Sequence, residues 1–238
     1  KTLTPVMEAD AIGGSVNLVT RSMPEEFRLS TTISGGSSPI RDDSYNTQFS
    51  FVLADKFSDR LSYSLSGSRN INDYGSDNIE FEWNESGDDY QINEMDMRIY
   101  DVKRQRESIS LNLDYQINSN NSIYIQSIYN ERHDWENRWR LRMDDPGAEG
   151  VGPYRVRKLR KGGVGNDTND NTRLELQKMW NVAVGGDHTF GKLAVNWKIS
   201  QSEASEERPD ERYIRFDQKG VDLTFDLTRT RFPRPVFG

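Results

Sequence analysis

Hydrophobic and polar residues alternate one by one along much of the chain, which is the pattern of a β-strand with two different faces. Between residues 61 and 66, for example, Leu61, Tyr63 and Leu65 are separated by serines. Strand-like runs with this character occupy residues 27–35, 45–54, 61–66, 111–117, 122–135, 174–177, 193–200 and 221–227. Helical periodicity is nearly absent, and even residues 94–104 suit an extended chain better than a helix. The pattern therefore predicts an all-β fold built from antiparallel hairpins.

Short and long connections alternate between these predicted strands. Short turns are expected at 55–59, 118–121 and 188–191, and long polar loops at about 73–96, 143–171 and 203–212. Loops longer than about 12–15 residues are uncommon in compact domains unless they are functional or disordered. Short turns at one end of a sheet and long loops at the other are typical of outer-membrane barrels.

The alternation suits two architectures. In a soluble β-sandwich the apolar face packs inward, whereas in a wide membrane barrel it meets lipid and the polar face meets water in the lumen. The extended region 97–117 is longer than the roughly 9–11 residues that cross the hydrocarbon, while sandwich strands usually have about 5–6. Phe57 and Phe190 lie at short turns, where an interfacial aromatic girdle would need them. These features favour the barrel and leave the sandwich as the alternative.

Composition supports a structure without a large apolar centre. Of 238 residues, 34% are hydrophobic and 29% are charged, which is poor in core-forming side chains for a domain of this size. Aromatic residues at 11% argue against plain disorder. The longest apolar run, at residues 49–54, is too short for a transmembrane helix, so that any membrane crossing would require a barrel.

Charge and motifs exclude several functional classes. The net charge of -7 does not predict a nucleic-acid partner. The chain has no cysteine, and His133 and His188 lie too far apart in sequence to suggest a metal pair. It contains no G-x-S-x-G elbow, no phosphate-binding glycine loop and no histidine metal motif. We therefore expect neither catalysis nor a metal or other cofactor.

Candidate ligand-binding residues are aromatic or basic and lie in or near the long polar stretches. Aromatic rings there could stack on sugar rings or on an aryl siderophore, or could belong to an outer aromatic belt instead. Arginines that alternate on one strand face could line a lumen and attract anions, or could form ladders with Asp and Glu on the next strand. The substrate-binding candidates are Trp83, Tyr90, Trp135, Trp139, Arg138 and Arg140, with Arg142 continuing the arginine alternation.

The opening segment carries a sharper signal. Residues 4–21 read TPVMEADAIGGSVNLVTR, which resembles the strand that closes the plug domain of TonB-dependent receptors, with Glu8 where that family usually has Asp. Gly13 and Gly14 would let the backbone turn or approach a neighbour closely. The residues that carry the motif are Ala11, Ile12, Gly13, Gly14, Ser15, Val16 and Asn17.

Weaker similarity to the same family follows in order along the chain. GSDNIEFEW at 75–83 is similar to a first extracellular loop, YDVKRQRESISLNLDYQIN at 100–118 to the strand after it, GGDHTFGKLAVNWKIS at 185–200 to a later hairpin, and RFP at 231–233 to a deeper barrel segment. The resemblance implies an antiparallel barrel of 22 strands around a plug. Residues 1–22 would end the plug, and 23–238 would supply about eight barrel strands of a protein truncated here at both ends.

The resemblance also implies a function. Such a receptor lies in the outer membrane of a Gram-negative bacterium, in contact with its lipid, binds a scarce nutrient and imports it when the TonB complex of the inner membrane acts on the plug. The nutrient would be a carbohydrate or a ferric siderophore. Two alternatives remain: a soluble or secreted β-sandwich that binds carbohydrate, and an outer-membrane enzyme or adhesin built on a small closed barrel.

Overall fold

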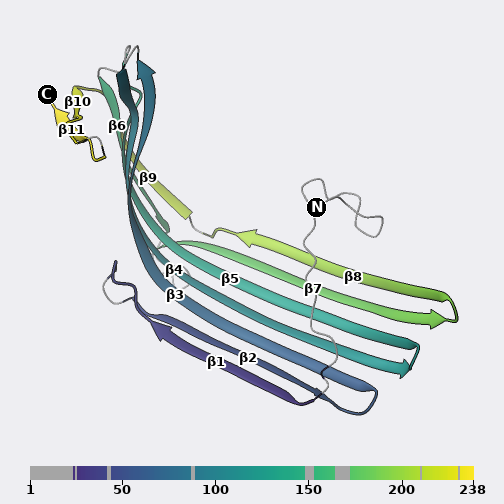
Figure 1. Cartoon of the computed structure of the whole chain (residues 1–238). Coiled ribbons are helices and arrows are strands. Elements are labelled where there is room, and N and C mark those ends of the chain that lie inside the picture. Colours follow the sequence, from purple (N-terminus) through teal and green to yellow (C-terminus); the bar gives the residue numbers. More distant parts are fainter. Residues whose placement is uncertain are drawn as a thin grey trace.

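The computed structural model describes residues 24, 26–41, 44–86, 89–147, 153–163, 172–209, 211–229 and 231–238 (Figure 1). Every regular element in these ranges is a β-strand, so the prediction of an all-β, antiparallel fold is confirmed. The plug motif at residues 11–17 and the whole predicted plug segment 1–22 lie outside the described residues.

The described residues form eleven strands in two antiparallel sheets. Nine of them form one open, curved sheet, and β10 and β11 form a separate two-stranded sheet. The strands are β1 (Arg28–Gly36), β2 (Asn46–Lys56), β3 (Leu61–Ser86), β4 (Asp89–Asn118), β5 (Asn121–Asp144), β6 (Tyr154–Gly163), β7 (Arg173–Phe190), β8 (Leu193–Glu207), β9 (Glu211–Val221), β10 (Leu223–Asp226) and β11 (Arg234–Phe237).

The three short turns predicted from the sequence are present and lie at one end of the large sheet (Figure 1). Residues 57–60 join β2 to β3, residues 119–120 join β4 to β5, and residues 191–192 join β7 to β8. Gly191 has a φ of +64°, a conformation that a residue without a side chain adopts at little cost. These tight turns fix the register of the three hairpins.

The predicted long loops are largely wrong. Residues 73–86 and 89–96 extend β3 and β4 into one ribbon, with Asp73 opposite Lys103 and Glu80 opposite Asp96. The ribbon forms because paired strands satisfy their own backbone groups, so a largely polar sequence can remain regular where charges pair across one face and a few hydrophobic residues, such as Ile92 and Met95, are buried on the other. The predicted loop 143–171 contains β6, and the predicted loop 203–212 contains the end of β8 and the start of β9.

Strand β5 has two partners along one edge. Its residues 121–136 pair with β7, and its residues 138–144 pair with β6. Strand β8 continues the sheet beyond β7, and β9 continues it beyond β6. The strands β6 and β7 thus follow one another on a single path across the sheet, and β8 and β9 follow one another on the next path. The nine described strands make seven paths across the sheet, close to the eight expected for this chain.

A small hydrophobic core lies at the end of the sheet away from the short turns. It contains Ile92, Met95, Met143, Tyr154 and Leu223. The Tyr154 hydroxyl donates a hydrogen bond of 2.8 Å to the backbone oxygen of Ile92. The strand predicted at 221–227 is therefore not part of the large sheet: β9 ends at Val221, and β10 folds over with β11 and contributes Leu223 to this core.

Truncation of Leu223 tests whether this core holds the β10–β11 hairpin in place. Leu223 has no exposed surface, so Leu223→Ala should lower the free energy of local opening of the hairpin by about 2–5 kcal/mol. Amide hydrogen exchange at residues 223–226 and 234–237 measures this change. Val236→Ala is the control, because Val236 is 50% exposed and its truncation should leave exchange nearly unchanged. Equal exchange in both variants would contradict the packing role.

Candidate functional site

An exposed apolar surface covers one face of the large sheet near the short turns. The strand registers align its side chains in rows; one row, for example, contains Leu53, Leu65 and Leu111. Exposed fractions reach 72% for Ile199 and 81% for Ile33. We call this surface the apolar belt and its face the outer face; it comprises Leu29, Ile33, Phe49, Phe51, Leu53, Leu61, Tyr63, Leu65, Ile109, Leu111, Leu113, Tyr115, Ile123, Ile125, Tyr129, Trp180, Val182, Val184, Leu193, Val195, Trp197 and Ile199.

The apolar belt has defined upper and lower edges. Towards the turns, Phe57 stacks on Tyr63 with ring centroids 4.4 Å apart. At the opposite edge a row of charged residues begins, where Arg69 pairs with Glu107 at 3.1 Å. Between these edges the belt is about nine residues tall, or roughly 30 Å along a strand. A strand tilted by about 35–45° would cover with that length an apolar band of roughly 25 Å, the height found in outer-membrane barrels.

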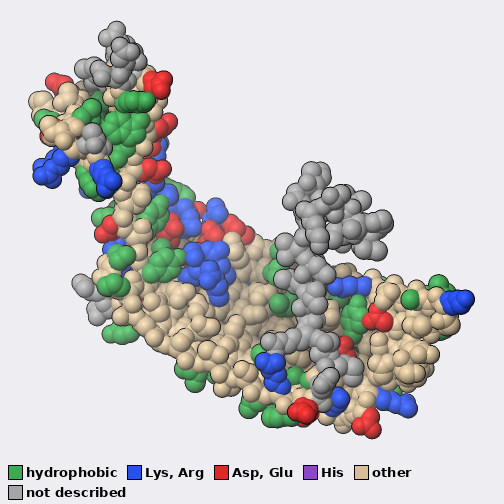
Figure 2. Space-filling view, viewed as in Figure 1, with side chains coloured by type: hydrophobic (Ala, Val, Ile, Leu, Met, Phe, Trp, Pro, Cys, Tyr) green, Lys and Arg blue, Asp and Glu red, His purple; other side chains and the backbone are tan. Residues whose placement is uncertain are grey.

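The opposite face of the same strands is small and polar, and we call it the polar face. Serines of β3 alternate with the belt residues, and the hydroxyls of Ser66 and Ser110 lie 2.7 Å apart across β3 and β4. Figure 2 looks onto the hollowed face of the sheet, where tan polar side chains and backbone dominate and green hydrophobic side chains fringe the lower rim. The sheet therefore separates an apolar surface from a polar one.

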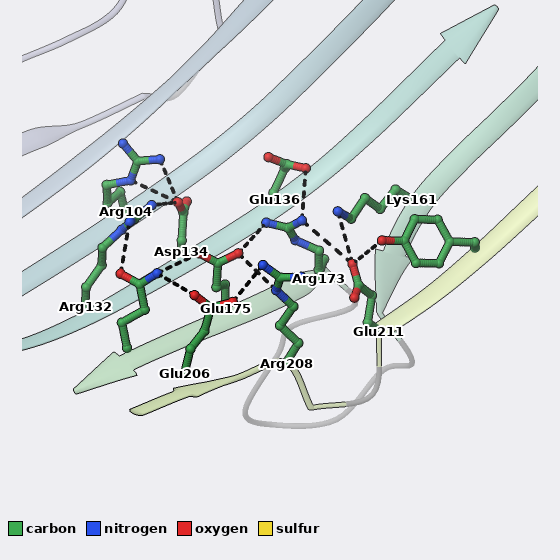
Figure 3. Close-up of polar contacts among 12 residues, drawn as sticks. Arg104, Arg132, Asp134, Glu136, Lys161, Arg173, Glu175, Glu206, Arg208 and Glu211 are labelled. Carbon is green, nitrogen blue, oxygen red and sulfur yellow. Dashed lines mark hydrogen bonds and ion pairs between the residues drawn. The ribbon is translucent and has the colours of Figure 1, made fainter. Parts of the chain in front are cut away.

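An ion-pair network crosses the polar face at the level where β6 gives way to β7 (Figure 3). Arg173, the first residue of β7, lies 2.9 Å from Glu175, 3.7 Å from Glu211 of β9 and 3.9 Å from Glu136 of β5. Lys161 of β6 contacts the same Glu211 at 3.1 Å. Side chains of four strands thus meet at this level and hold the strand ends together.

A second charged centre lies further from the turns. Asp96 is fully buried and accepts hydrogen bonds from Arg142 (2.8 Å from Nε) and Arg98 (2.5 Å). Burial alone would raise the pKa of Asp96, but the hydrogen bonds and charges of Arg142 and Arg98 outweigh it and lower the pKa below its ordinary value. Asp96 therefore stays ionised and neutralises two arginines.

The predicted arginines do alternate on one strand face, and that face is the polar one. Arg142 belongs to the ladder with Asp96, which was one of the two possibilities considered for it. Arg138 and Arg140 differ, because no carboxylate of the described residues lies within 4.0 Å of either, and the buried Nε atom of each has no hydrogen-bond partner. The Arg138 guanidinium instead lies 5.8 Å from the centre of the Tyr100 ring.

The predicted tryptophans lie on the outer face, away from these arginines. Trp135 stacks on His133 at 5.1 Å, Arg160 lies 5.7 Å from the ring centre of Trp139, and Trp83 contacts Phe81 at 6.2 Å. Adjacent residues of a strand point to opposite faces, so Trp139 cannot join its neighbours Arg138 and Arg140 in one site. Tyr90 is 61% exposed near the far end of the β3–β4 ribbon. Contact of any of these residues with a substrate stays a prediction.

The sequence reasoning missed two groupings that depend on cross-strand register. One is an apolar cavity of about 960 Å³ on the outer face beyond the belt, lined by residues that include Ile99, Leu141, Phe216 and Phe232. The other is the set of polar-face residues beside Arg138 and Arg140, described below. Alternation along β4 could have indicated that Arg98 and Tyr100 share a face, but not which residues of β5 lie opposite them.

Within the described ranges, no cluster of three or more His, Asp or Glu residues is arranged to hold a metal ion. The same ranges contain no helix with the length and hydrophobicity that a membrane crossing requires.

Comparisons with known protein families, with curated proteins and with solved structures gave no match.

Replacement of Asp96 tests the charged centre. Asp96→Asn leaves Arg98 and Arg142 without their shared charge and should cost about 3–5 kcal/mol. Because the folded pKa of Asp96 is lowered, its contribution is complete above the unfolded pKa of about 4 and is lost as pH falls through the folded value. Unfolding measured from pH 7 down to pH 2 should therefore show a loss of stability below about pH 4 that is smaller in the variant.

The control for this experiment is Asp77→Asn. Asp77 also pairs with an arginine, Arg41, but its side chain is 67% exposed. Exposed pairs contribute about 0–1 kcal/mol, so this variant should unfold almost like the original protein. If the two variants lose stability equally, Asp96 does not hold the far part of the sheet.

Proposed function

We propose that this chain is part of a transmembrane β-barrel of the outer-membrane type. The observation that carries the proposal is the apolar belt: a continuous band of exposed hydrophobic side chains about nine residues tall, on strands whose opposite face is polar. The position of all three short turns at one edge of the belt supports the same assignment. Lipid would cover the belt, and water would fill the hollow on the polar face.

The belt argues against the soluble sandwich. A sandwich buries its apolar faces between two sheets about 10 Å apart. In the described residues the second sheet is the β10–β11 hairpin, which packs at the far end and leaves the belt uncovered. Exposed apolar patches on soluble monomers rarely exceed a few hundred Å², so a surface spanning seven strand paths requires an apolar environment.

The openness of the sheet argues against the small closed barrel. Strand β1 has one partner, β2, and β8 has one partner, β7, among the described strands. An eight-stranded barrel has an interior just wide enough for side chains to fill. Here the polar face carries a broad hollow with charged networks, which suits the wall of a wide lumen.

The specific receptor class rests on the sequence. We propose a TonB-dependent receptor of a Gram-negative outer membrane, because residues 4–21 resemble the closing strand of that family's plug. Such a receptor binds a carbohydrate or a ferric siderophore outside the cell and imports it with energy that the TonB complex transmits. The chain would supply the end of the plug and the first barrel strands.

Neighbouring cysteines on the two faces of β8 test the membrane assignment. The 238-residue sequence contains no cysteine, so Ile199→Cys and Lys198→Cys each introduce a single thiol into it. Both positions are exposed. Each variant is labelled with a small fluorophore in outer membranes of cells that produce the protein. The label at 199 should be quenched by brominated lipid, and the label at 198 by aqueous iodide, because the two side chains point to opposite faces.

The matched pair makes the result decisive. The two positions are adjacent, so depth and local mobility are nearly the same and only the face differs. A several-fold preference of each label for its own quencher supports a strand that separates lipid from water. Quenching of both labels by iodide alone would reject the barrel and favour a water-soluble protein.

A further inference from the structure

Two neighbouring rows of the polar face contain cations and no carboxylate. The strand registers place one residue of each of β4, β5, β6 and β9 in each row. The first row is Tyr100, Arg138, Lys161 and Tyr213, and the second row is Arg98, Arg140, Leu159 and Arg215. We call these eight residues the cationic rows. Figure 2 shows Lys and Arg side chains gathered in the hollow of the sheet, at the level of its bend.

The acids that border the cationic rows are already paired. Asp96 is shared by Arg98 and Arg142, Glu211 contacts Lys161 and Arg173, and Asp217 pairs with Arg155. Among the described residues, these pairs leave Arg138, Arg140 and Arg215 without a carboxylate within 4.0 Å. These three arginines differ in this respect from most other arginines of the polar face, which do have an acidic partner.

The two central arginines are also incompletely hydrogen-bonded. The Nε–H groups of Arg138 and Arg140 are buried and have no acceptor among the described residues, and a buried donor without a partner is unfavourable. Burial and the nearby charge of Arg142 lower the pKa of Arg140; Asp96 opposes this shift, whereas Arg138 and Arg157 add to it. An anion bound to these guanidinium groups would relieve the repulsion between the cations.

We propose that the cationic rows bind a ligand with two or more carboxylate or phosphate groups. Side chains on one face of a strand recur about every 7 Å, and neighbouring strands lie about 5 Å apart, so the rows offer cations at those spacings. Guanidinium groups can bind each oxyanion in a bidentate manner. Tyr213 is 54% exposed, and the Lys161 Nζ lies 5.2 Å from its ring centre, so an aromatic face adjoins the cations.

This inference narrows the substrate class of the proposed receptor. A neutral oligosaccharide would leave the arginines uncompensated, whereas an anionic sugar or a polycarboxylate chelate would pair with them. Binding of an anion depends only on the polar face. The description of that anion as the imported substrate rests on the proposed function.

Binding assays on the purified full-length protein in detergent test the proposal. The probes are tetragalacturonate, which carries carboxylates on a sugar scaffold, tripolyphosphate, and neutral maltotetraose. We expect the two anions to bind and maltotetraose to fail. Arg138→Gln and Arg140→Gln should each weaken anion binding about tenfold, the loss expected when one charged hydrogen-bonding partner is removed.

Lys198→Gln is the control, because it removes one positive charge from the same face of the sheet. Lys198 lies on β8, outside the cationic rows, and is exposed, so its loss should change the affinity less than twofold. Among the described residues, neither Arg138 nor Arg140 pairs with a carboxylate, so their replacement leaves no acid without its counter-ion. Both variants should therefore keep the melting temperature of the original protein. That measurement separates lost binding from lost folding.

Each outcome bears on one of the two proposals. Binding of neither anion, or equal binding by all three variants, overturns the cationic rows as a site. Tighter binding of tetragalacturonate assigns a carboxylated sugar, and tighter binding of tripolyphosphate assigns a phosphorylated ligand. Uptake of the bound anion by cells with and without a proton gradient then tests import: binding without energy-dependent uptake would overturn the receptor function and leave the anion site standing.

Discussion

The uninterrupted hydrogen-bond ladder between β4 and β5 determines which residues share a face. Its register runs without a shift from Met95 opposite Met143 to Gln116 opposite Ser122. Side chains alternate strictly along a paired strand, so the ladder keeps one set of residues on the outer face from the turn to the far end. A slip by one residue between β4 and β5 would place the hydrophobic side chains of one strand beside the polar side chains of the other. The apolar belt, the buried Asp96 centre and the cationic rows all depend on this register.

Local patterns in the sequence predicted the turn-side half of the sheet. Alternating serines and hydrophobic residues at 61–66 and short polar turns encode hairpins through interactions between near neighbours, and the structure has those hairpins. The far half was misread because residues 73–96 are rich in polar residues, and their few hydrophobic ones, such as Phe81, Ile92 and Met95, pack against partners distant in sequence that local patterns do not reveal. The arginine alternation of β5 was recognised, since it is local. Trp139 lies on the opposite face of β5 from Arg138 and Arg140, which also follows from local alternation. The sequence analysis nevertheless grouped these candidates by their position in the chain.

Charges on the polar face serve two different purposes. Around Arg173 and Asp96 each charge has opposite partners, and these contacts hold strand ends and the far ribbon in place. Between these two centres, Arg138 and Arg140 lie without such partners. Half-buried cations that lie side by side without a counter-ion repel each other, and a bound anionic ligand would offset this repulsion. The scaffold and the proposed anion site are therefore built from the same residue types with different pairing.

The position where β6 gives way to β7 has a consequence for how such a protein can diversify. Strands β6 and β7 are each held to β5 by their own ladder, so the register of one does not depend on the register of the other. Segments of different length and sequence can therefore be exchanged at this position over evolutionary time while the strand order and both faces are preserved. The strand ends at this position belong to the charged network of the polar face, so an exchanged segment would change the chemistry beside the hollow while the sheet keeps its register.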